Sequence, residues 1–367
     1  MAGFFHAEFI ARGLVWPPHV SATGSMRAIL LPLILLSACA AAAAQTPPET
    51  HAPPPPAAQP NVPPPTLDTV LVAGEQPGPG LWKVTRRDSD HVLWILGTQA
   101  PLPKTLSWRS DEVEKIIAQS QEVLTDAQAD VKIGFFRTVF LLPAALSAKK
   151  NADGATLKQV LPPDLYARWL PLKERYLGKD DGVERLRPIL AANELYSKAI
   201  GKSGMTNKNA LWPVIEKIAK QHRVPIREIE VEIPLDNARQ AIDDFKSTAG
   251  QLDVDCLATT IQRLETDLGA MRARANAWAI GDLEKLKSLP YPDQRSVCLN
   301  ALAANANLRE KLADARKRLQ TEWIEAAEAA LWDNPSTFAV LPISELVNAD
   351  GRLATMRKKG YVVEEPQ

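Results

Sequence analysis

Histidine is scarce in this chain of 367 residues, and its scarcity bears directly on metal chemistry. Only five histidines occur, and His6, His19 and His51 all precede the globular part of the sequence. The other two, His91 and His222, fall in a predicted hairpin turn and at the end of a predicted helix, where solvated or capping roles are typical. A metal site built on imidazole ligands is therefore not expected.

Other common signatures are missing as well. The sequence has no Gly-x-Ser-x-Gly elbow for a serine nucleophile and no glycine-rich loop for a nucleotide. Its 43 basic residues balance its 43 acidic residues, so no excess of charge favours nucleic acid or an anionic membrane surface as a partner. Hydrophobic residues still make up 46% of the chain, which is enough to bury a core.

The N-terminal segment has the features of a bacterial export signal. Met26-Arg27 precede the apolar run 28–36, which is shorter than the ~20 residues needed to span a bilayer. The run ends in Leu36-Ser37-Ala38-Cys39, which fits the lipobox of lipoproteins, so we expect lipidation, including palmitate, at Cys39. Residues 26–45 are therefore predicted to be a signal peptide, and residues 1–25 an over-extended start.

The alternative is ordinary cleavage within Ala40–Gln45, which would discard Cys39 and leave a soluble periplasmic protein. Ala40 is not the aspartate expected for retention at the inner membrane, so the sequence favours an outer-membrane lipoprotein on the periplasmic side of the envelope. Residues 46–66 hold ten of the thirty prolines, a composition that tends to extended polyproline II. Residues 46–80 are thus predicted to be a disordered tether, or alternatively a proline-rich recognition ligand.

The remaining residues, 81–366, alternate strand and helix patterns and predict an α/β domain. Leu81–Arg87 and Val92–Thr98 are short β-type runs separated by a polar turn, so they predict a hairpin. A helix is expected from Ser110 to about Gln121. Further elements are a strand at 122–127, helices broken by prolines 143, 162–163, 171 and 188, a helix over 207–222, and later strands at 224–230, 337–343 and 361–364.

Two long helices are expected at 254–287 and 294–331, and they would form an antiparallel hairpin. Cys256 and Cys298 are left as a pair if Cys39 carries lipid, and an oxidising periplasm permits a disulfide between them. An unbroken antiparallel pair would hold these cysteines far apart, at ~1.5 Å per residue. The disulfide therefore requires a break in the first helix, at Gly269 or Gly281, and two buried free thiols are the alternative.

Four sequence elements occur in an order that matches one known family. Leu81–Val84 followed by Trp94–Thr98 looks like an opening hairpin, and the run from Val214 to Glu230 is similar to a segment that leads to a "LET" glutamate. Ala277–Asp282 matches an "aW..GD" element, and Phe338–Glu364 matches a C-terminal block. Together they resemble the TraB/GumN family, which includes the Tiki-type metalloproteases. The resemblance implies a compact α/β domain with a parallel-type sheet, an N-terminal hairpin and long helical insertions.

The resemblance also implies a divalent metal, held by a Gly-x-x-His signature, acidic residues and a late histidine. Here the signature reads Gly97-Thr98-Gln99-Ala100, so Ala100 stands at the histidine position, and Glu345 stands at the late one. Asp126 and Glu230 keep the acidic positions. An all-carboxylate site from Asp126, Glu230 and Glu345 is one alternative, because Mg²⁺ and Ca²⁺ take oxygen ligands. The other is that these acids cap loops or pair with arginine and lysine.

Two functions follow from these observations. The first is a pseudoenzyme, a degenerate lipoprotein without cofactor or hydrolase activity that acts as a binding or scaffold module. Its partners would be the membrane, through the lipid anchor, and an envelope protein, a peptide or a glycan. The alternative is a metal-dependent hydrolase, peptidase- or esterase-like, that uses Asp126, Glu230 and Glu345 as ligands or acid/base groups. A third idea, haem or hydrophobic-ligand binding, rests on fold analogy alone.

Overall fold

The computed structural model describes residues 75–132, 135–234, 237–247, 250–289, 298 and 306–366, and all of these belong to one unit. The predicted signal peptide, Cys39 and the proline-rich tether up to residue 74 lie outside the described residues. The first elements after residue 75 are the strands β1 (Leu81–Thr85) and β2 (Val92–Thr98), which pair antiparallel as the predicted hairpin.

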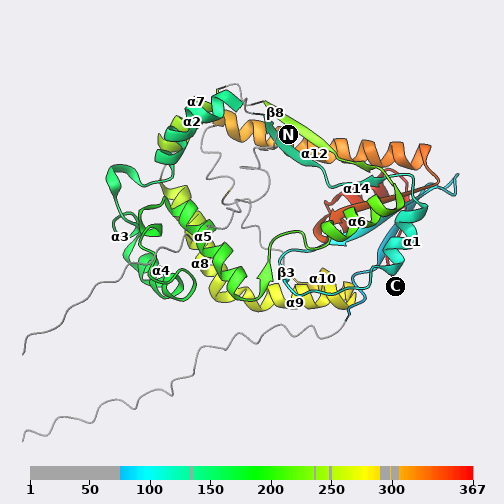
Figure 1. The fold of residues 1–367 in the computed structure, drawn as a ribbon, viewed down its shortest axis with the longest axis horizontal. Coiled ribbons are helices and arrows are strands. Elements are labelled where there is room, and N and C mark those ends of the chain that lie inside the picture. The colour runs from blue at the N-terminus through cyan, green and yellow to red at the C-terminus, as the bar shows by residue number, and fades with distance from the viewer. Residues whose placement is uncertain are drawn as a thin grey trace, which may run out of the picture. The chain divides into compact units, whose positions relative to one another are not determined.

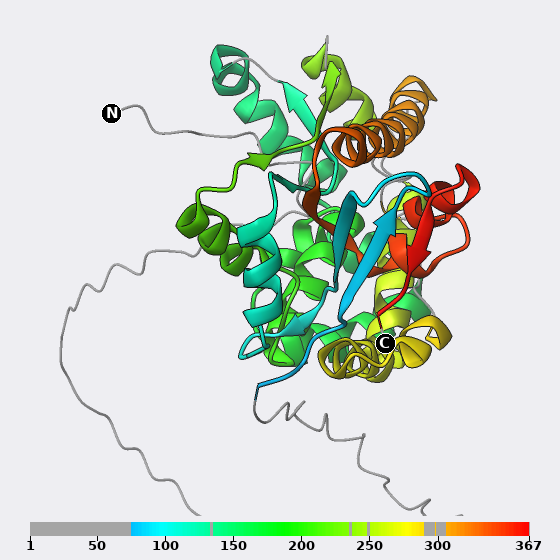
Figure 2. The same cartoon turned by 90° about the vertical axis from the view of Figure 1, so that its right-hand side faces the viewer.

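This hairpin is part of a six-stranded sheet in the order β10–β1–β2–β9–β4–β7. Strands β2, β9, β4 and β7 are mutually parallel, whereas β1 runs antiparallel to both β2 and β10. Figure 2 shows the blue N-terminal hairpin beside the red C-terminal strand. The α/β fold with a parallel-type sheet is therefore confirmed. The remaining strands of the sheet are β4 (Val123–Leu124), β7 (Ile226–Arg227), β9 (Ser336–Pro342) and β10 (Val362–Glu364).

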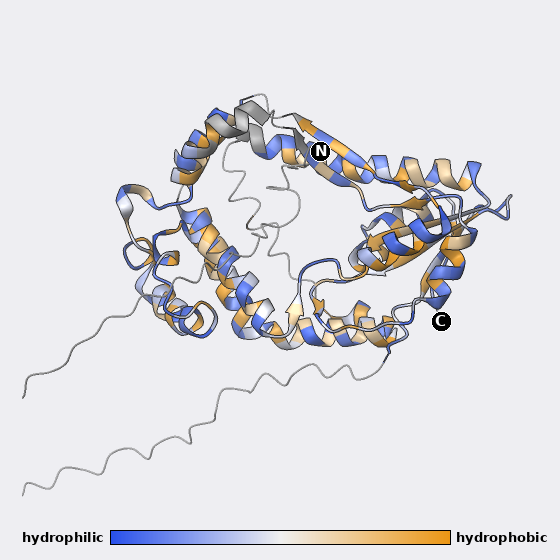
Figure 3. Cartoon of the chain, viewed as in Figure 1, coloured by the Kyte–Doolittle hydropathy of each residue, from blue (hydrophilic) through white to orange (hydrophobic). Residues whose placement is uncertain are grey.

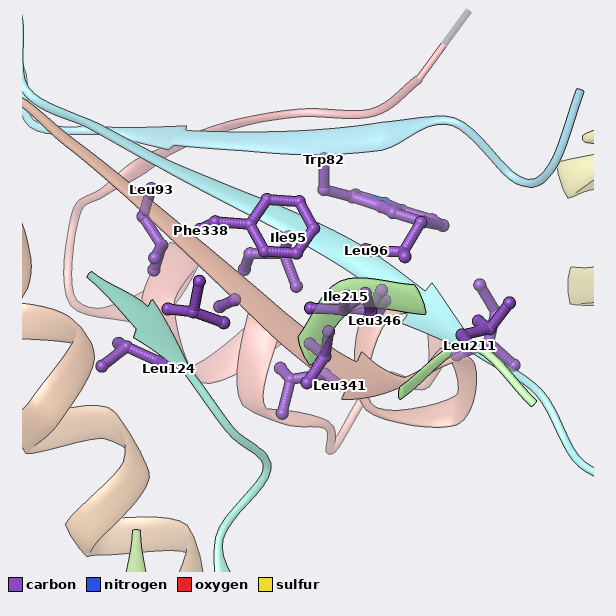
Figure 4. Packing of buried hydrophobic residues seen from close by; sticks show 14 of the residues in the cluster. Trp82, Leu93, Ile95, Leu96, Leu124, Leu211, Ile215, Phe338, Leu341 and Leu346 are labelled. Carbon is purple, nitrogen blue, oxygen red and sulfur yellow. The ribbon is translucent and has the colours of Figure 1, made fainter. Parts of the chain in front are cut away.

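The hydrophobic core lies against the central strands of this sheet. Leu93, Ile95 and Phe338 are fully buried, and the close view in Figure 4 shows them beside Leu341 and Ile215. Strands β2 and β9 are continuous apolar runs rather than alternating ones, and most of their residues are buried. This pattern is typical of central parallel strands that are covered on both faces.

Three amphipathic helices contribute to this core. Helix α6 (Trp212–His222) buries Ile215 and Ile218, as its apolar spacing predicts, and it packs on α1 (Asp111–Gln119). Helix α12 (Ala306–Asp333) contacts β2 and β9. It buries Trp323, Ala327 and Leu331, which are spaced four residues apart. Figure 3 shows both hydrophobic and hydrophilic residues along α1 and α12, consistent with one buried and one solvated side.

The helical insertions lie between β4 and β9 in the sequence, and none of the described helices is long and apolar enough to cross a membrane. Pro163 and Pro188 begin helices, but Pro143 and Pro171 lie inside α2 and α4, so the breaks predicted at those two residues are wrong. The insertions contain α2 (Phe135–Ala148), α3 (Leu157–Val160), α4 (Pro163–Tyr176), α5 (Pro188–Lys202), α7 (Ala238–Ser247), α8 (Gln251–Thr266), α9 (Leu268–Ile280), α10 (Leu283–Ser288) and short 3₁₀ turns at Ala152–Gly154 and Val183–Arg185.

Two small ribbons accompany the main sheet. Strands β5 (Gln128–Lys132) and β8 (Glu230–Pro234) pair in parallel, and β3 (Leu102–Pro103) pairs antiparallel with β6 (Met205–Thr206). The single strand expected at 224–230 is divided, because β7 ends at Arg227 in the main sheet and β8 begins at Glu230 in the ribbon.

The antiparallel hairpin of two long helices is wrong. Helix α12 packs on β8 and β2, because its apolar residues cover strands, and it lies apart from α8 and α9 in Figure 1. The first helix is interrupted at Asp267, between α8 and α9, and again at Gly281, which adopts φ +75°. Cys298 is bonded to Cys256 of α8, with Sγ atoms 2.00 Å apart. Its neighbours at 290–297 and 299–305 lie outside the described residues.

A buried ion pair joins three of the inserted helices. The Arg187 guanidinium donates to both carboxylate oxygens of Asp253, at 2.7 and 2.9 Å, and each side chain is 1% exposed. Its third nitrogen donates to the carbonyl of Phe245, whose ring lies 3.6 Å below the guanidinium carbon. This pair links the start of α5 to α7 and α8.

Candidate functional site

The four parallel strands end at one edge of the sheet, where α/β proteins commonly bind ligands. Most of the residues singled out from the sequence follow these strand ends. Thr98 ends β2 and Ala100 follows it, and Asp126 comes two residues after β4. Glu345 lies in α13 (Ile343–Val347), directly after β9. The topology thus places these positions at the same edge.

Asp126 and Glu345 meet around one arginine that the sequence reasoning missed. Arg352, the first residue of α14 (Arg352–Lys358), places its Nη1 2.5 Å from an oxygen of Asp126. Its backbone N–H donates to the Glu345 carboxylate at 3.1 Å. The Arg352 side chain is 8% exposed, whereas that of Asp126 is 34% exposed, so solvent reaches the cluster from the Asp126 side.

The electrostatic balance at Asp126 combines opposing effects. Burial raises the pKa of its carboxyl above the ordinary value, although the charge of Arg352 and its hydrogen bond act to lower it. The negative charge of Glu345 also raises the Asp126 pKa, because the two carboxylates repel each other. Arg352 therefore offsets part of the repulsion between the two acids.

Glu230 does not join this cluster. It is exposed at the start of β8, where it pairs in register with Gln128 of β5. In the part of the chain that the structure describes, its carboxylate forms no hydrogen bond or ion pair, in contrast to Asp126. The three acids expected to act together are therefore divided: Asp126 and Glu345 bind Arg352, whereas Glu230 faces solvent.

The Gly97–Ala100 segment fixes the end of β2 and carries neither a histidine nor a carboxylate. A Cβ on Gly97 would lie 2.5 Å from Cδ1 of Ile343 and 3.1 Å from a ring carbon of Trp82, so a larger residue requires these buried side chains to shift. Trp278 donates from Nε1 to the Gly97 carbonyl at 2.7 Å, and Thr98 donates to the Leu341 carbonyl at 3.2 Å. Ala100 is exposed. The family element at 277–282 therefore secures the strand end structurally.

The two histidines of the domain serve local contacts. His91 contacts the Leu331 carbonyl through Nδ1 at 3.1 Å, and His222, the last residue of α6, contacts Glu114 at 3.0 Å. Among the described residues, no group of three or more His, Cys, Asp and Glu side chains is placed to hold a metal ion. The divalent metal that the resemblance implies does not fit the residues present, because Ala100 supplies no ligand and Asp126 is bound to Arg352.

A surface pocket of about 240 Å³ lies at the other end of the sheet, beside the β1–β2 turn. Arg86 of this turn stacks on Trp332, with its guanidinium carbon 3.2 Å from the ring centroid, and donates to both oxygens of Asp88. Lys359 and Tyr361 line the same pocket, and both contact Glu328. Because Asp126 and Glu345, the acids singled out from the sequence, lie at the carboxyl edge instead, we regard that edge as the candidate site.

Sequence reasoning missed Arg352 and Trp323 because neither belongs to a short motif. Trp323 lies on α12 with its ring centroid 5.7 Å from the Arg352 guanidinium carbon. The one available signal was the Asp350-Gly351-Arg352 turn, which places a cation at the start of a helix, close to Glu345. Long-range pairing with Asp126, 226 positions away, has no local signature.

Comparison with known proteins identifies the family of the chain. No curated protein and no solved structure matches the chain. The model of the TraB/PrgY/gumN family matches residues 80–365, which include every strand and helix described here. The chain therefore belongs to the TraB/PrgY/gumN family.

Proposed function

We propose that this protein is an exported, lipid-anchored member of the family that binds a ligand or partner protein without hydrolysing it. The signal peptide, the lipobox at Cys39 and the proline-rich segment at 46–80 support delivery to the periplasmic side of the envelope, with the outer membrane as the expected location. In this arrangement the tether holds the folded domain away from the lipid.

The ion pair between Arg352 and Asp126 carries the proposal that the domain is not a hydrolase. A carboxylate must be free of other partners to bind a metal ion well, and here one Asp126 oxygen lies 2.5 Å from the Arg352 guanidinium. The fixed positive charge of Arg352 would also repel a divalent cation. Glu345 accepts from the backbone of the same arginine, and Ala100 has no ligand atom. Arg352 thus provides the positive charge that a metal would supply between two acids.

Metal titration of the purified protein tests this proposal. We expect calorimetry with Zn²⁺, Mn²⁺ and Mg²⁺ to show no stoichiometric binding, and peptide and ester libraries to remain uncleaved. Arg352→Met tests whether the guanidinium is what excludes a metal ion from Asp126 and Glu345, because it removes that group. Its metal titration is compared with that of Lys358→Met, which removes a positive charge elsewhere on the same helix. If the wild type released product, and if chelation and Glu230→Ala both abolished that release, the carboxylate hydrolase would replace this proposal.

Intact mass of the native protein tests the anchor separately. We expect the mature chain to begin at an acylated Cys39 and to sediment with membranes, and we expect Cys39→Ser to abolish both. A native N-terminus within Ala40–Gln45, without lipid, would show instead that the protein is soluble in the periplasm.

A further inference from the structure

Two buried N–H groups beside Asp126 have no acceptor among the described residues. Trp323 is 0% exposed and Arg352 is 6% exposed, yet neither the indole Nε1 of Trp323 nor the Nε of Arg352 forms a hydrogen bond there. Buried donors are nearly always paired, because leaving one unpaired loses the hydrogen bond that it made to water. Two such donors in one cluster are available to an acceptor that is not part of the protein.

The two donors belong to a single locus. The guanidinium carbon of Arg352 lies 5.7 Å from the centroid of the Trp323 ring, and the Nη1 of the same arginine binds Asp126. The residues come from α12, α14 and the segment after β4, all at the carboxyl edge of the sheet. Most comparable buried donors are satisfied: Trp278 reaches the Gly97 carbonyl, and all three Arg187 nitrogens have acceptors.

We propose that Arg352 Nε and Trp323 Nε1, the Arg–Trp donor pair, bind a carboxylate group of the protein's ligand. This inference rests on the proposed function, since it names the chemistry of the ligand that the domain would bind. An indole N–H only donates, and a guanidinium donates with a positive charge, so the pair matches an acceptor that is negatively charged.

The neighbouring acids restrict the ligand further. Asp126 binds the guanidinium of Arg352 and Glu345 accepts from its backbone N–H, so the cluster holds two negative charges and one positive charge. Each further negative charge on the ligand adds repulsion, and a group with one negative charge is therefore favoured over a group with two. A carboxylate carries one charge and is planar, which suits the guanidinium edge that includes Nε. The 34% exposure of Asp126 gives the side from which the ligand approaches. The carboxylate belongs to a peptide C-terminus or to a sugar acid, and these two sources are distinguished by experiment.

Calorimetric titration of the full-length protein, purified with its native N-terminus, tests the donor pair. The probes are N-acetylglycine, which presents a peptide-like carboxylate, and glucuronate, which presents a sugar carboxylate. Their neutral counterparts, N-acetylglycinamide and glucose, are the controls. We expect saturable binding of one carboxylate and at least tenfold weaker binding of its neutral counterpart. The carboxylate that binds identifies the source.

Trp323→Phe removes one donor while keeping an aromatic ring, and we expect it to weaken carboxylate binding ~2- to 10-fold. Trp332→Phe is the matched control, because Trp332 is 60% exposed at the amino end of the sheet, and it should leave the affinity unchanged. The inference is overturned if neither carboxylate binds, or if Trp323→Phe binds as tightly as the wild type. Metal-dependent hydrolysis would instead overturn the proposed function, so the two failures are separable.

Discussion

Two arginine–aspartate pairs in this domain differ in how completely their polar groups are satisfied. The Arg187–Asp253 pair is 1% exposed on both sides, and every guanidinium nitrogen of Arg187 has an acceptor. The Arg352–Asp126 pair has one short bond, a partly solvated carboxylate and an Nε without an acceptor in the part of the chain that the structure describes. The first pair completes the packing of three helices, whereas the second lies at a sheet edge and has bonding capacity left over. This leftover capacity makes the second pair the candidate for binding a ligand.

The largest effect is expected from Asp253→Ala. It leaves the buried charge of Arg187 without its partner, a change that typically costs about 3–5 kcal/mol of the free energy of unfolding. Urea denaturation measures this loss. Asp255→Ala on the same helix is the control, because among the described residues its carboxylate is hydrogen-bonded only to Gln251, within one helical turn. Asp126→Ala should cost less, because solvent reaches Asp126 and Glu345 remains beside Arg352. Equal losses from both aspartates would remove the difference between the pairs.

The two buried tryptophans sharpen the same comparison. Trp278→Phe and Trp323→Phe delete the same atoms from fully buried rings. Among the described residues, only the Trp278 indole has an acceptor, the Gly97 carbonyl. Trp278→Phe should therefore be about 1–3 kcal/mol more destabilising than Trp323→Phe, because it leaves a buried carbonyl unpaired. Thermal and urea unfolding of the two variants give this difference. If the two variants lose equal stability, Trp323 Nε1 has an acceptor of similar strength within the protein.

The sequence predicts the sheet better than the site. Strands β2 and β9 and the stripe of α6 follow from local apolar patterns, so their positions are confirmed within a few residues. The polar sequence of β5 has no such pattern. The spacing of apolar residues in α12 shows that one side of the helix is buried, but it does not specify which strands that side covers. Asp126 and Glu345 were predicted from family positions. Arg352 was not, because an ion pair across 226 positions depends on the assembled fold.

The smallest effects concern the pH dependence of two aspartates that both accept hydrogen bonds from arginine. Burial raises the pKa of Asp126 above its ordinary value of 3.8, with Arg352 opposing and Glu345 reinforcing the change. Hydrogen bonding to Arg86 lowers the pKa of Asp88, which is exposed. The folded protein therefore holds the proton of Asp126 more tightly than the unfolded chain does, and that of Asp88 less tightly. The stability that Asp126 contributes is present below pH 3.8 and is lost as the pH rises through its raised pKa. The stability that Asp88 contributes is present above pH 3.8 and is lost as the pH falls through its lowered pKa.

Urea unfolding of the wild type, Asp126→Asn and Asp88→Asn at several pH values from about 3 to about 7 measures both trends. We expect the stability of the wild type relative to Asp126→Asn to fall as pH rises, and its stability relative to Asp88→Asn to rise. Each variant is thus the control for the other. If the Asp126 difference rose with pH instead, attraction to Arg352 would outweigh burial. Arg352 would then be held tightly by Asp126, and the distinction between the two arginines would rest on its unpaired Nε alone.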